Sequence, residues 1–444
     1  MEREAFIAAL IDEALRQGAD AAETFSAVNR DFEVEALEGE IDKYSVSRTA
    51  GVGLRVLVGG RNGYAYTERT EEPALLVGRA IDNANCLTDS DEHPMQTKQT
   101  YRAVQGTASP LEAMREEERI ALALRLERDT LAVDSRVKRV SACGVETAAG
   151  EIAIRNTLGL DARRSSAFSC IYVEPVIEDG GEVQTGFAFR MGAEVLDTAG
   201  CAREAVEDAL SRLNASPVPS GTYRILLRNA ALADLLKAFS GIFSAEAAQK
   251  GMSLLNGREG EQIAADCLTV TDDPFNAVRP RAFDGEGTPC TAKKLIDAGR
   301  LTTLLHNLKT AKKAGCETTG NASRPSAASQ VGVAPSMLVV SPGTADHATL
   351  LKMLGTGLEI TDLQGLHAGL NAVSGDFSLK AIGRRIENGV DVGAVSGITL
   401  AGNFLTLLKG IEAVGSDRYT ALPSGSGGVI CPSVLIDALT VAGK

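Results

Sequence analysis

Apolar residues recur at three- and four-residue intervals in several stretches of the first half of the chain. In residues 3–17 this spacing, followed directly by Gly18, predicts an amphipathic helix that ends at the glycine. Residues 74–84, 111–133 and 195–213 are predicted to form helices as well, and 111–133 is the clearest long one. We therefore expect four helices in the first half of the chain.

Between these helices the pattern changes to short runs that are typical of strands. The glycine-rich segment 59–63 separates two such runs and predicts a hairpin. Two further strand pairs are expected after the long helix, one broken at 148–150 and the other at 179–181. The strands expected near the N-terminus are 24–28, 31–37, 41–47, 51–58 and 64–67. Helices combined with antiparallel strands predict an α+β fold.

Residues 214–221 (NASPVPSG) interrupt this pattern, because two prolines among small polar residues oppose regular structure. After this segment, short β-like runs, among them 301–306, alternate with glycine and proline, which predicts a β-rich barrel or sandwich. We therefore predict an N-terminal α+β domain at 1–87, a central helix-and-strand region at 88–213 packed with it, and a β-rich C-terminal domain at 222–444.

Composition narrows the classes of function. The 444 residues carry a formal net charge of −13 and include no tryptophan, so a general nucleic-acid surface, which needs basic residues and stacking aromatics, is not expected. No apolar run is long enough to span a membrane. The N-terminus lacks the pattern of a signal peptide, and the eight cysteines form no CxxC pair. We therefore expect a cytoplasmic protein with reduced thiols.

One stretch in the second half places a carboxylate on a short helix before a glycine-rich loop. Residues 245–250 (AEAAQK) are mostly good helix formers, and Gly251 predicts the end of the helix. An apolar run at helical spacing, 231–239, precedes them. Glu246 is therefore expected on a helix just before the loop 251–261. Taken alone, a single glutamate on a helix is most often a solvated surface residue.

Six short motifs follow one another along the second half of the chain. They are FDGEGTP (283–289), LIDAGRL (295–301), TTGNA (318–322), SGDFS (374–378), ENG (387–389) and ITLAGN (398–403). Motifs of this kind in this order resemble the TldD/PmbA family, also known as TldE or modulator of DNA gyrase proteins. The resemblance extends over nearly the whole chain, and the segment 432–437 is similar to the ending of the TldE/PmbA branch.

The resemblance implies a zinc site in relatives that this chain does not keep. In the TldD branch the helix at 245–250 carries the zinc-peptidase pattern His-Glu-x-x-x-His, and a cysteine near the C-terminus resembles a third ligand. Here Ala245 and Lys250 stand at the two histidines and Ser426 stands at the cysteine, so only Glu246 is kept. An ammonium group and a neutral hydroxyl are poor zinc ligands. We therefore expect no metal in this chain.

The same resemblance implies a peptide-binding cleft, because the family is thought to bind extended peptides along exposed strands. The candidate lining residues are Glu246, Thr319, Gly320, Asn321, His367, Gly375, Asp376 and Asn403. We expect the segments 319–321 and 374–376 to line one groove with Glu246. A second interpretation stays open, in which the glycines only supply positive φ in turns and the polar residues only cap turns.

These observations favour a non-catalytic subunit of the TldE/PmbA type. The resemblance implies that such a subunit pairs with a TldD-like chain, which holds the zinc, and that the pair degrades or processes peptides and unfolded polypeptides. A homodimer is the second possible assembly. The alternative functions are a stand-alone hydrolase with a non-zinc or unrecognised site and a peptide-binding scaffold. The gyrase-related name gives no argument that so acidic a chain contacts DNA.

Overall fold

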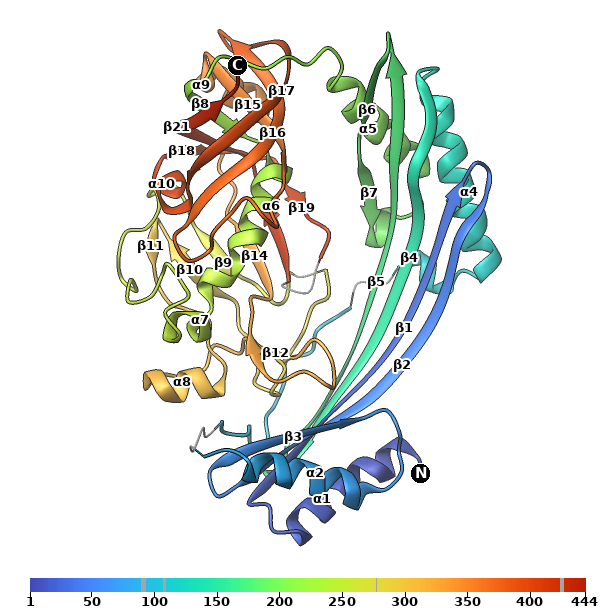
Figure 1. The fold of residues 1–444 in the computed structure, drawn as a ribbon, viewed down its shortest axis with the longest axis vertical. Coiled ribbons are helices and arrows are strands. Elements are labelled where there is room, and N and C mark those ends of the chain that lie inside the picture. The colour runs from blue at the N-terminus through green and yellow to red at the C-terminus, as the bar shows by residue number, and fades with distance from the viewer. Residues whose placement is uncertain (89–92, 107–108, 277, 424–426) are drawn as a thin grey trace.

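A long antiparallel sheet forms one side of the molecule, and a β-rich half that includes a barrel forms the other (Figure 1). This computed structural model describes residues 1–88, 93–106, 109–276, 278–423 and 427–444. The predicted α+β fold with a β-rich C-terminal half is confirmed, and the barrel form is observed.

The N-terminal sheet has the strand order β3-β2-β1-β4-β5-β6, and β7 also pairs with β5. Its central strands β1, β2, β4 and β5 have 17, 19, 20 and 19 residues, several times the usual strand length of about 5–6 residues. The sheet is therefore a long, curved ribbon (Figure 1). Its strands are β1 (Ala21–Leu37), β2 (Glu40–Val58), β3 (Arg61–Thr67), β4 (Val137–Asn156), β5 (Asp161–Asp179), β6 (Glu182–Thr185) and β7 (Ala188–Met191).

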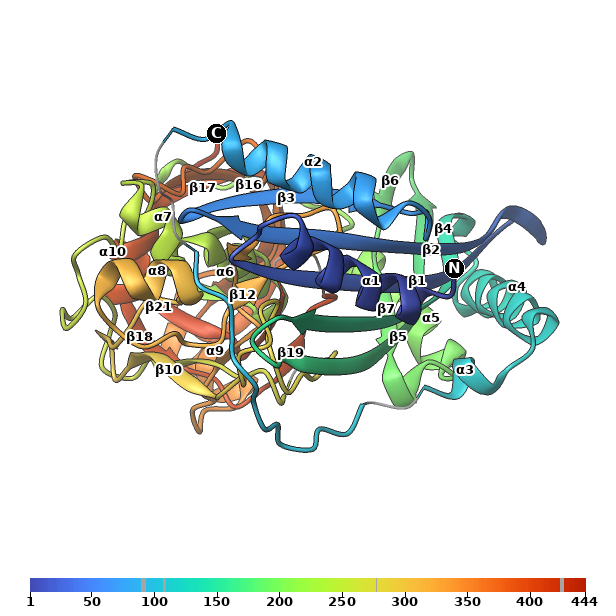
Figure 2. The same ribbon diagram turned by 90° about the horizontal axis from the view of Figure 1, so that it is seen from below.

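Two pairs of helices cover opposite ends of one face of this sheet, which we call the outer face (Figures 1 and 2). Ala22 of β1 packs there with α1 and α2, and Phe32 and Val34 pack with α4 and α5. Odd-numbered β1 residues such as Phe25 point to the opposite, inner face, toward the C-terminal half. The helices of this half are α1 (Arg3–Arg16), α2 (Pro73–Asn85), α3 (Pro110–Ala113), α4 (Glu116–Val133), η1 (Gly192–Glu194) and α5 (Thr198–Ser211).

The predictions of separate strands at 24–28 and 31–37 and of a break at 148–150 are wrong, because β1 and β4 run through both places. Asn29 of β1 lies opposite Gly150 of β4, and a Cβ atom on Gly150 would come within 3.2 Å of Asn29 Oδ1. The glycine therefore makes room for a side chain inside a continuous ladder and does not mark a turn.

The helix predicted at 111–133 is interrupted. It begins as α3, and Met114 and Arg115 are extended before α4 begins. The backbone N–H of Arg115 donates to Glu118 Oε2 (2.7 Å), which caps the start of the second helix. The strands predicted at 41–47 and 51–58 are the two ends of one strand, β2, which stays paired with β1 along its length.

The C-terminal half contains a closed barrel and a second sheet. The barrel closes because β17 pairs with β16 on one side and with β21 on the other, while β15 and β8 complete the ring. The second sheet has the order β11-β10-β9-β14-β20-β19, and β12 and β13 form a separate hairpin. The barrel strands and β18 are β8 (Gly221–Leu227), β15 (Gly357–Gln364), β16 (Asp376–Glu387), β17 (Val390–Asn403), β18 (Ile411–Val414) and β21 (Val434–Ala442).

The remaining strands are β9 (Val270–Asp272), β10 (Lys293–Asp297), β11 (Arg300–Leu301), β12 (Ala322–Ser323), β13 (Gly332–Val333), β14 (Met337–Val340), β19 (Tyr419–Thr420) and β20 (Gly428–Cys431). The strand predicted at 301–306 is therefore wrong apart from its first residue, which ends β11. Beyond it the chain turns to form a single bridge between Leu305 and Ser244.

Helix α6 packs against the barrel strand β15 and against β20 of the second sheet, and so joins the two into one core. The rings of Phe239, on α6, and Phe404, on α10, stack with centroids 4.3 Å apart inside this core. None of the helices in the described part of the chain has the length and apolar character needed to span a bilayer. The helices of this half are α6 (Asn229–Phe239), η2 (Ser240–Phe243), α7 (Ala245–Gln249), α8 (Leu308–Ala314), α9 (His347–Leu354) and α10 (Phe404–Lys409).

Candidate functional site

Helix α7 carries the glutamate singled out in the sequence. Ser244 caps its start by accepting a hydrogen bond from Ala247 N (3.3 Å), and Gly251, at φ +70°, follows its end as predicted. Lys250 Nζ donates to Glu246 Oε1 (2.7 Å), so these two residues, four apart on the helix, form an ion pair. Both side chains reach solvent, so this pair contributes little to stability.

The two faces of α7 have different surroundings. Ala245 is 1% exposed and belongs to the C-terminal core, so its side chain points away from Glu246 into packed apolar residues. On the other side, a Cβ atom on Gly332 of β13 would lie 3.8 Å from Glu246 Oε2. Glu246 therefore lies beside the β12–β13 hairpin.

The segment Thr319 to Asn321 lies in a buried polar network rather than on an open surface. Thr319 Oγ1 donates to Asn321 Oδ1 (2.8 Å), and Asn321 Nδ2 donates to Asp272 Oδ2 (2.6 Å). Lys293 Nζ reaches the same two oxygens at 2.9 and 3.2 Å. Gly320 has φ +70°, and a Cβ atom there would meet Pro289 O at 2.7 Å, so the position requires glycine. In this network the segment holds the hairpin β12–β13 against the second sheet.

Gly375, Asp376 and Asn403 meet elsewhere, at the end of the barrel. Asn403 Nδ2 donates to Asp376 Oδ1 (2.9 Å) and to Ser374 O (2.9 Å), while its Oδ1 accepts from Leu405 N (3.2 Å) and so caps α10. The side chains of Asn403 and Ser374 lower the pKa of Asp376. These contacts are of the turn-capping kind that the second interpretation describes.

Ser374 and Asn403 also line a hollow of about 370 Å³ together with Leu254 and Arg258, which follow α7. The structure thus brings the 374–376 motif toward the glycine-rich loop after Glu246. The residues 319–321 are not among those that line this hollow, and they belong to the Asp272 network instead. His367 is exposed in the turn between β15 and β16, and it forms no hydrogen bond with either network among the described residues. Ser426 lies outside the described residues.

A buried ionic cluster joins the two halves of the molecule, and we call it the central ionic cluster. Glu23 accepts hydrogen bonds from Arg55 Nη2 (3.2 Å) and Arg324 Nη1 (2.9 Å). Glu286 contacts His93 through a hydrogen bond and lies 4.0 Å from Arg55 Nη1. All five side chains are at most 4% exposed. Burial alone would raise the pKa of Glu286, but the hydrogen bond from His93 and the charge of Arg55 lower it below its ordinary value.

Sequence reasoning assigned no role to this cluster. In the sequence Glu286 is one residue of the FDGEGTP motif, and its partner His93 lies 193 residues away. The structure gives that motif a physical meaning. Asp284 Oδ1 accepts from the N–H groups of Glu286 and Thr288, both at 2.9 Å, which holds the turn that presents Glu286 to Arg55.

A cavity of about 430 Å³ lies between the inner face of the long sheet and the C-terminal half, and we call it the inner cavity. Arg164 and Phe168 of β5 line its sheet side. Arg279 and Arg281 line the opposite side, and Arg324 borders it near the central ionic cluster. This group of four arginines could not be predicted from the sequence, because its members come from three separate segments.

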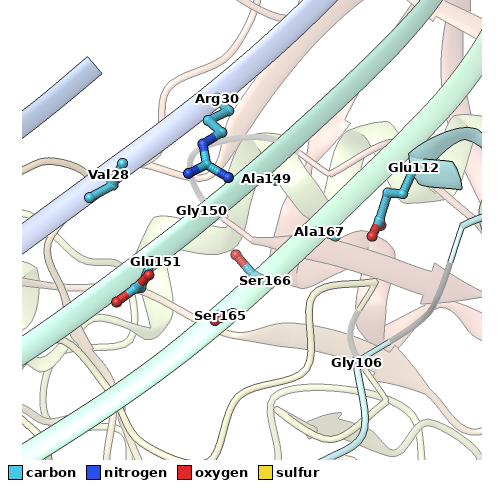
Figure 3. A pocket seen from close by; sticks show the side chains of 10 residues that line it. All are labelled: Val28, Arg30, Gly106, Glu112, Ala149, Gly150, Glu151, Ser165, Ser166 and Ala167. Carbon is cyan, nitrogen blue, oxygen red and sulfur yellow. The ribbon is translucent and has the colours of Figure 1, made fainter. Parts of the chain in front are cut away.

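A second hollow of about 430 Å³ lies on the outer face of the sheet, over strands β1, β4 and β5 (Figure 3). Arg30 of β1 and Glu151 of β4 line it, and Glu112 of α3 borders it. Gly150 and Ser166 line both this hollow and the inner cavity, so only the sheet separates the two. Its charges are mixed in sign, and they point to no particular ligand.

Comparison with known proteins identifies the family. Models of the PmbA/TldA metallopeptidases match three successive parts of the chain, domain 1 at residues 22–84, the central domain at 109–213 and the C-terminal domain at 220–443. The last of these alone covers half of the chain. This chain belongs to the PmbA/TldD metallopeptidase family.

Members of the PmbA/TldD family from bacteria and archaea are similar over nearly their full length. Metalloprotease PmbA of Escherichia coli O157:H7 is 25% identical over 96% of this chain and 93% of its own. A metalloprotease of Methanothermobacter thermautotrophicus is 27% identical, with 89% and 88% covered. A solved Thermotoga maritima structure that carries a DNA-gyrase-modulator name is 32% identical and superposes with a TM-score of 0.91 over 99% of this chain and all of the other. TldE of Thermococcus kodakarensis, at 23% identity and a TM-score of 0.90 with 99% and 100% covered, shares the fold.

The residues at α7 do not fit the zinc ion that the name of this metallopeptidase family implies. Zinc needs neutral imidazole, thiolate or carboxylate ligands, with one position open for water. Ala245 offers no donor atom and is buried, and the ammonium group of Lys250 is held by Glu246. Throughout the part of the chain that the structure describes, no three His, Cys, Asp or Glu side chains gather as a metal site would require.

Proposed function

We propose that this chain is the non-catalytic, PmbA/TldE-type subunit of a metallopeptidase, which assembles with a TldD-type chain that holds the zinc. The observation that carries the proposal is which residues α7 has at the ligand positions and what they contact. Lys250 stands at a ligand position and is ion-paired with Glu246, the residue that would serve as the base. The family membership and the relatives named metalloprotease PmbA support the assignment to the PmbA/TldE branch.

In this proposal the subunit contributes binding surface instead of chemistry. The β12–β13 hairpin lies beside Glu246. The outward N–H and C=O groups of Ala322 on β12 are taken by Asp284 and Gly285, so an extended peptide would pair along the outer edge of β13, whatever its side chains. The substrates would then be peptides and unfolded polypeptides. We also propose a cytoplasmic location, which the eight free thiols support.

The proposal is tested by mixing this chain with a TldD-type chain. A tagged form of this chain is expected to co-purify with a chain from the same genome that carries His-Glu-x-x-x-His, and the mixture is expected to cleave an unstructured peptide that this chain alone leaves intact. Cleavage by this chain alone, at the rate of the mixture, would favour the stand-alone hydrolase. Binding of peptide with no cleavage in any mixture would favour the scaffold.

The isolated chain is expected to hold no stoichiometric zinc, because a buried methyl group and an ammonium group replace two of the three ligands. The measurement is elemental analysis by mass spectrometry after dialysis against metal-free buffer. The TldD-type partner, treated in parallel, is the positive control. About one zinc per chain retained by the isolated subunit would contradict the prediction.

The chain purified alone is expected to form a dimer, because the resemblance implies a family that works as pairs. Light scattering coupled to gel filtration at micromolar concentration should then give twice the 46.5 kDa of one chain. Addition of the TldD-type partner should convert this species into a heterodimer, which native mass spectrometry can distinguish. A monomer in both samples would count against the assembly.

A further inference from the structure

Three of the arginines around the inner cavity have no acidic partner among the residues that the structure describes. Arg164 comes from β5, whereas Arg279 and Arg281 come from the loop after β9. Within the described part of the chain, none of the three forms an ion pair, although Arg324 nearby is paired with Glu23. We call Arg164, Arg279 and Arg281 the basic cluster. It is a local excess of positive charge in a chain whose net charge is −13.

Parts of this cluster are buried without a hydrogen-bond partner. The Nε atoms of Arg164 and Arg281 are both shielded from solvent and lack an acceptor among the described residues. A buried donor without an acceptor costs about 1–3 kcal/mol, and more when it is charged. Burial, followed by the charges of Arg281 and Arg279, lowers the pKa of Arg164 to about 10. The protein therefore maintains an unfavourable arrangement that a bound acceptor would relieve.

Two carboxylates act on the basic cluster through their charge. One of them is occupied by backbone hydrogen bonds, and the other lies at the edge of the cluster. Asp284 acts on Arg164, but its two oxygens accept hydrogen bonds from the backbone, including Ala322 N at 2.9 Å. Asp31 acts on Arg279 from the neighbouring part of the inner face. Among the described residues, the one side chain that forms a hydrogen bond with the cluster is neutral: Arg281 Nη2 donates to Ser336 Oγ (2.5 Å). No group in the described chain therefore neutralises the cluster.

The walls between the arginines limit what can enter. Phe168 lies under the Arg279 guanidinium, 5.1 Å from ring centroid to Cζ, and Phe283 lies 5.7 Å from Arg164. A volume of about 430 Å³ is in the range of pockets for small molecules, so a folded domain or a nucleic-acid duplex is excluded by size. An extended peptide end fits, with a carboxylate that matches the planar fork of arginine.

We propose that the basic cluster binds a carboxylate of an extended peptide, either its C-terminal carboxylate or an Asp or Glu side chain, in the inner cavity. The proposal rests on the proposed function, in which peptides are the ligands. It adds a place and a chemical preference: the subunit holds acidic or C-terminal segments, and it does so at a site distinct from α7.

The test is calorimetric titration of the isolated chain with three N-acetylated hexapeptides of alanine and serine. One has a free C-terminal carboxylate, one has a C-terminal amide, and one is an amide with a single internal glutamate. The two acidic peptides are expected to bind at least about tenfold more tightly than the neutral amide, as charge-assisted bidentate hydrogen bonds to arginine require. A preference for only one of the two acidic peptides identifies which carboxylate the site takes.

Arg164→Gln is expected to remove most of this preference, and Arg163→Gln is the matched control. Arg163 is the next residue on β5, but it points to the outer face, where it pairs with Glu4 and is exposed. Arg164→Gln should leave the midpoint of urea unfolding unchanged or raised, since it removes repulsion from Arg281. A purely structural arginine would instead lower that midpoint. Arg279→Gln, at an exposed position, serves as a second variant if Arg164→Gln fails to fold.

Three kinds of result would overturn the proposal, and the proposed function is judged separately from it. If all three peptides bind equally well, or if both variants keep the preference, peptides bind elsewhere and only the carboxylate site is wrong. If none of the peptides binds, peptide binding by this subunit is wrong too, while cleavage by the mixed complex is judged by its own assay. The proposal would also be overturned if a single-stranded oligonucleotide displaced the bound acidic peptide at a lower concentration than further acidic peptide does.

Discussion

In a reconstituted complex, replacing the glutamate of the partner's His-Glu-x-x-x-His helix by glutamine is expected to slow peptide cleavage by a factor of about 10² to 10⁴. Glu246→Gln in this chain is expected to leave the rate nearly unchanged. The difference follows from the surroundings of α7, because a base without a metal-bound water has no proton to take. Glu246 is held by Lys250 at 2.7 Å, and Ala245 offers no ligand.

The comparison needs proof that both variant complexes assemble, which gel filtration of the mixtures provides. Lys250→Gln is a useful companion variant, since it releases Glu246 from its ion pair without adding a zinc ligand. It should also leave the rate unchanged. If Glu246→Gln removed activity while the complex stayed intact, this chain would be a catalytic subunit and the proposed function would be wrong.

Glu23→Gln is expected to lower the free energy of unfolding by about 3–5 kcal/mol. The carboxylate of Glu23 lies between Arg55 and Arg324, and all three side chains are at most 1% exposed. Glutamine has the same shape, so the loss comes from leaving two buried guanidinium groups short of negative charge and not from a cavity. Urea unfolding followed by circular dichroism measures the change.

Glu33→Gln is the matched control. Glu33 lies on the same strand and the same face as Glu23, ten residues further on, and it pairs with the exposed Lys43 at 2.6 Å. Removing this surface pair should cost far less. The double variant Glu23→Gln with Arg324→Met should recover part of the loss, because it removes one of the uncompensated charges. Equal effects of Glu23→Gln and Glu33→Gln would show that burial of the cluster has no energetic consequence.

Much of the fold could be predicted from local patterns, and the errors in the long strands have one cause. The helices α1, α2 and α5 and the hairpin β2–β3 follow from periodicity and turn residues. The strands predicted from the sequence end at polar residues and glycines, such as Asn29 and Gly150, where the observed strands continue. Those residues face cavities on the two sides of the sheet, where polar groups and missing side chains are compatible with a continuous ladder. A sequence does not show that a strand passes between two cavities.

Part of the candidate site, too, could be predicted from the sequence, and part could not. The residues of the short helix α7 are known from the sequence, and the ion pair of Glu246 with Lys250 could be predicted because it depends on spacing within that helix. The location of the motifs relative to one another could not. The segments 319–321 and 374–376 enter separate hydrogen-bond networks, and the basic cluster brings residue 164 together with residues 279 and 281 only through the packing of the two halves.

The central ionic cluster also bears on how the chain is made. Glu23 and Arg55 leave the ribosome early, yet Arg324, their neighbour, is separated from Glu23 by 301 residues of sequence. At typical rates of synthesis the nascent N-terminal sheet waits on the order of tens of seconds before that arginine and Glu286 emerge. Until then its inner face exposes apolar residues such as Phe25 and an incomplete set of charges. The sheet therefore matures after translation of the C-terminal half, and chaperones that shield exposed strands would act during that interval.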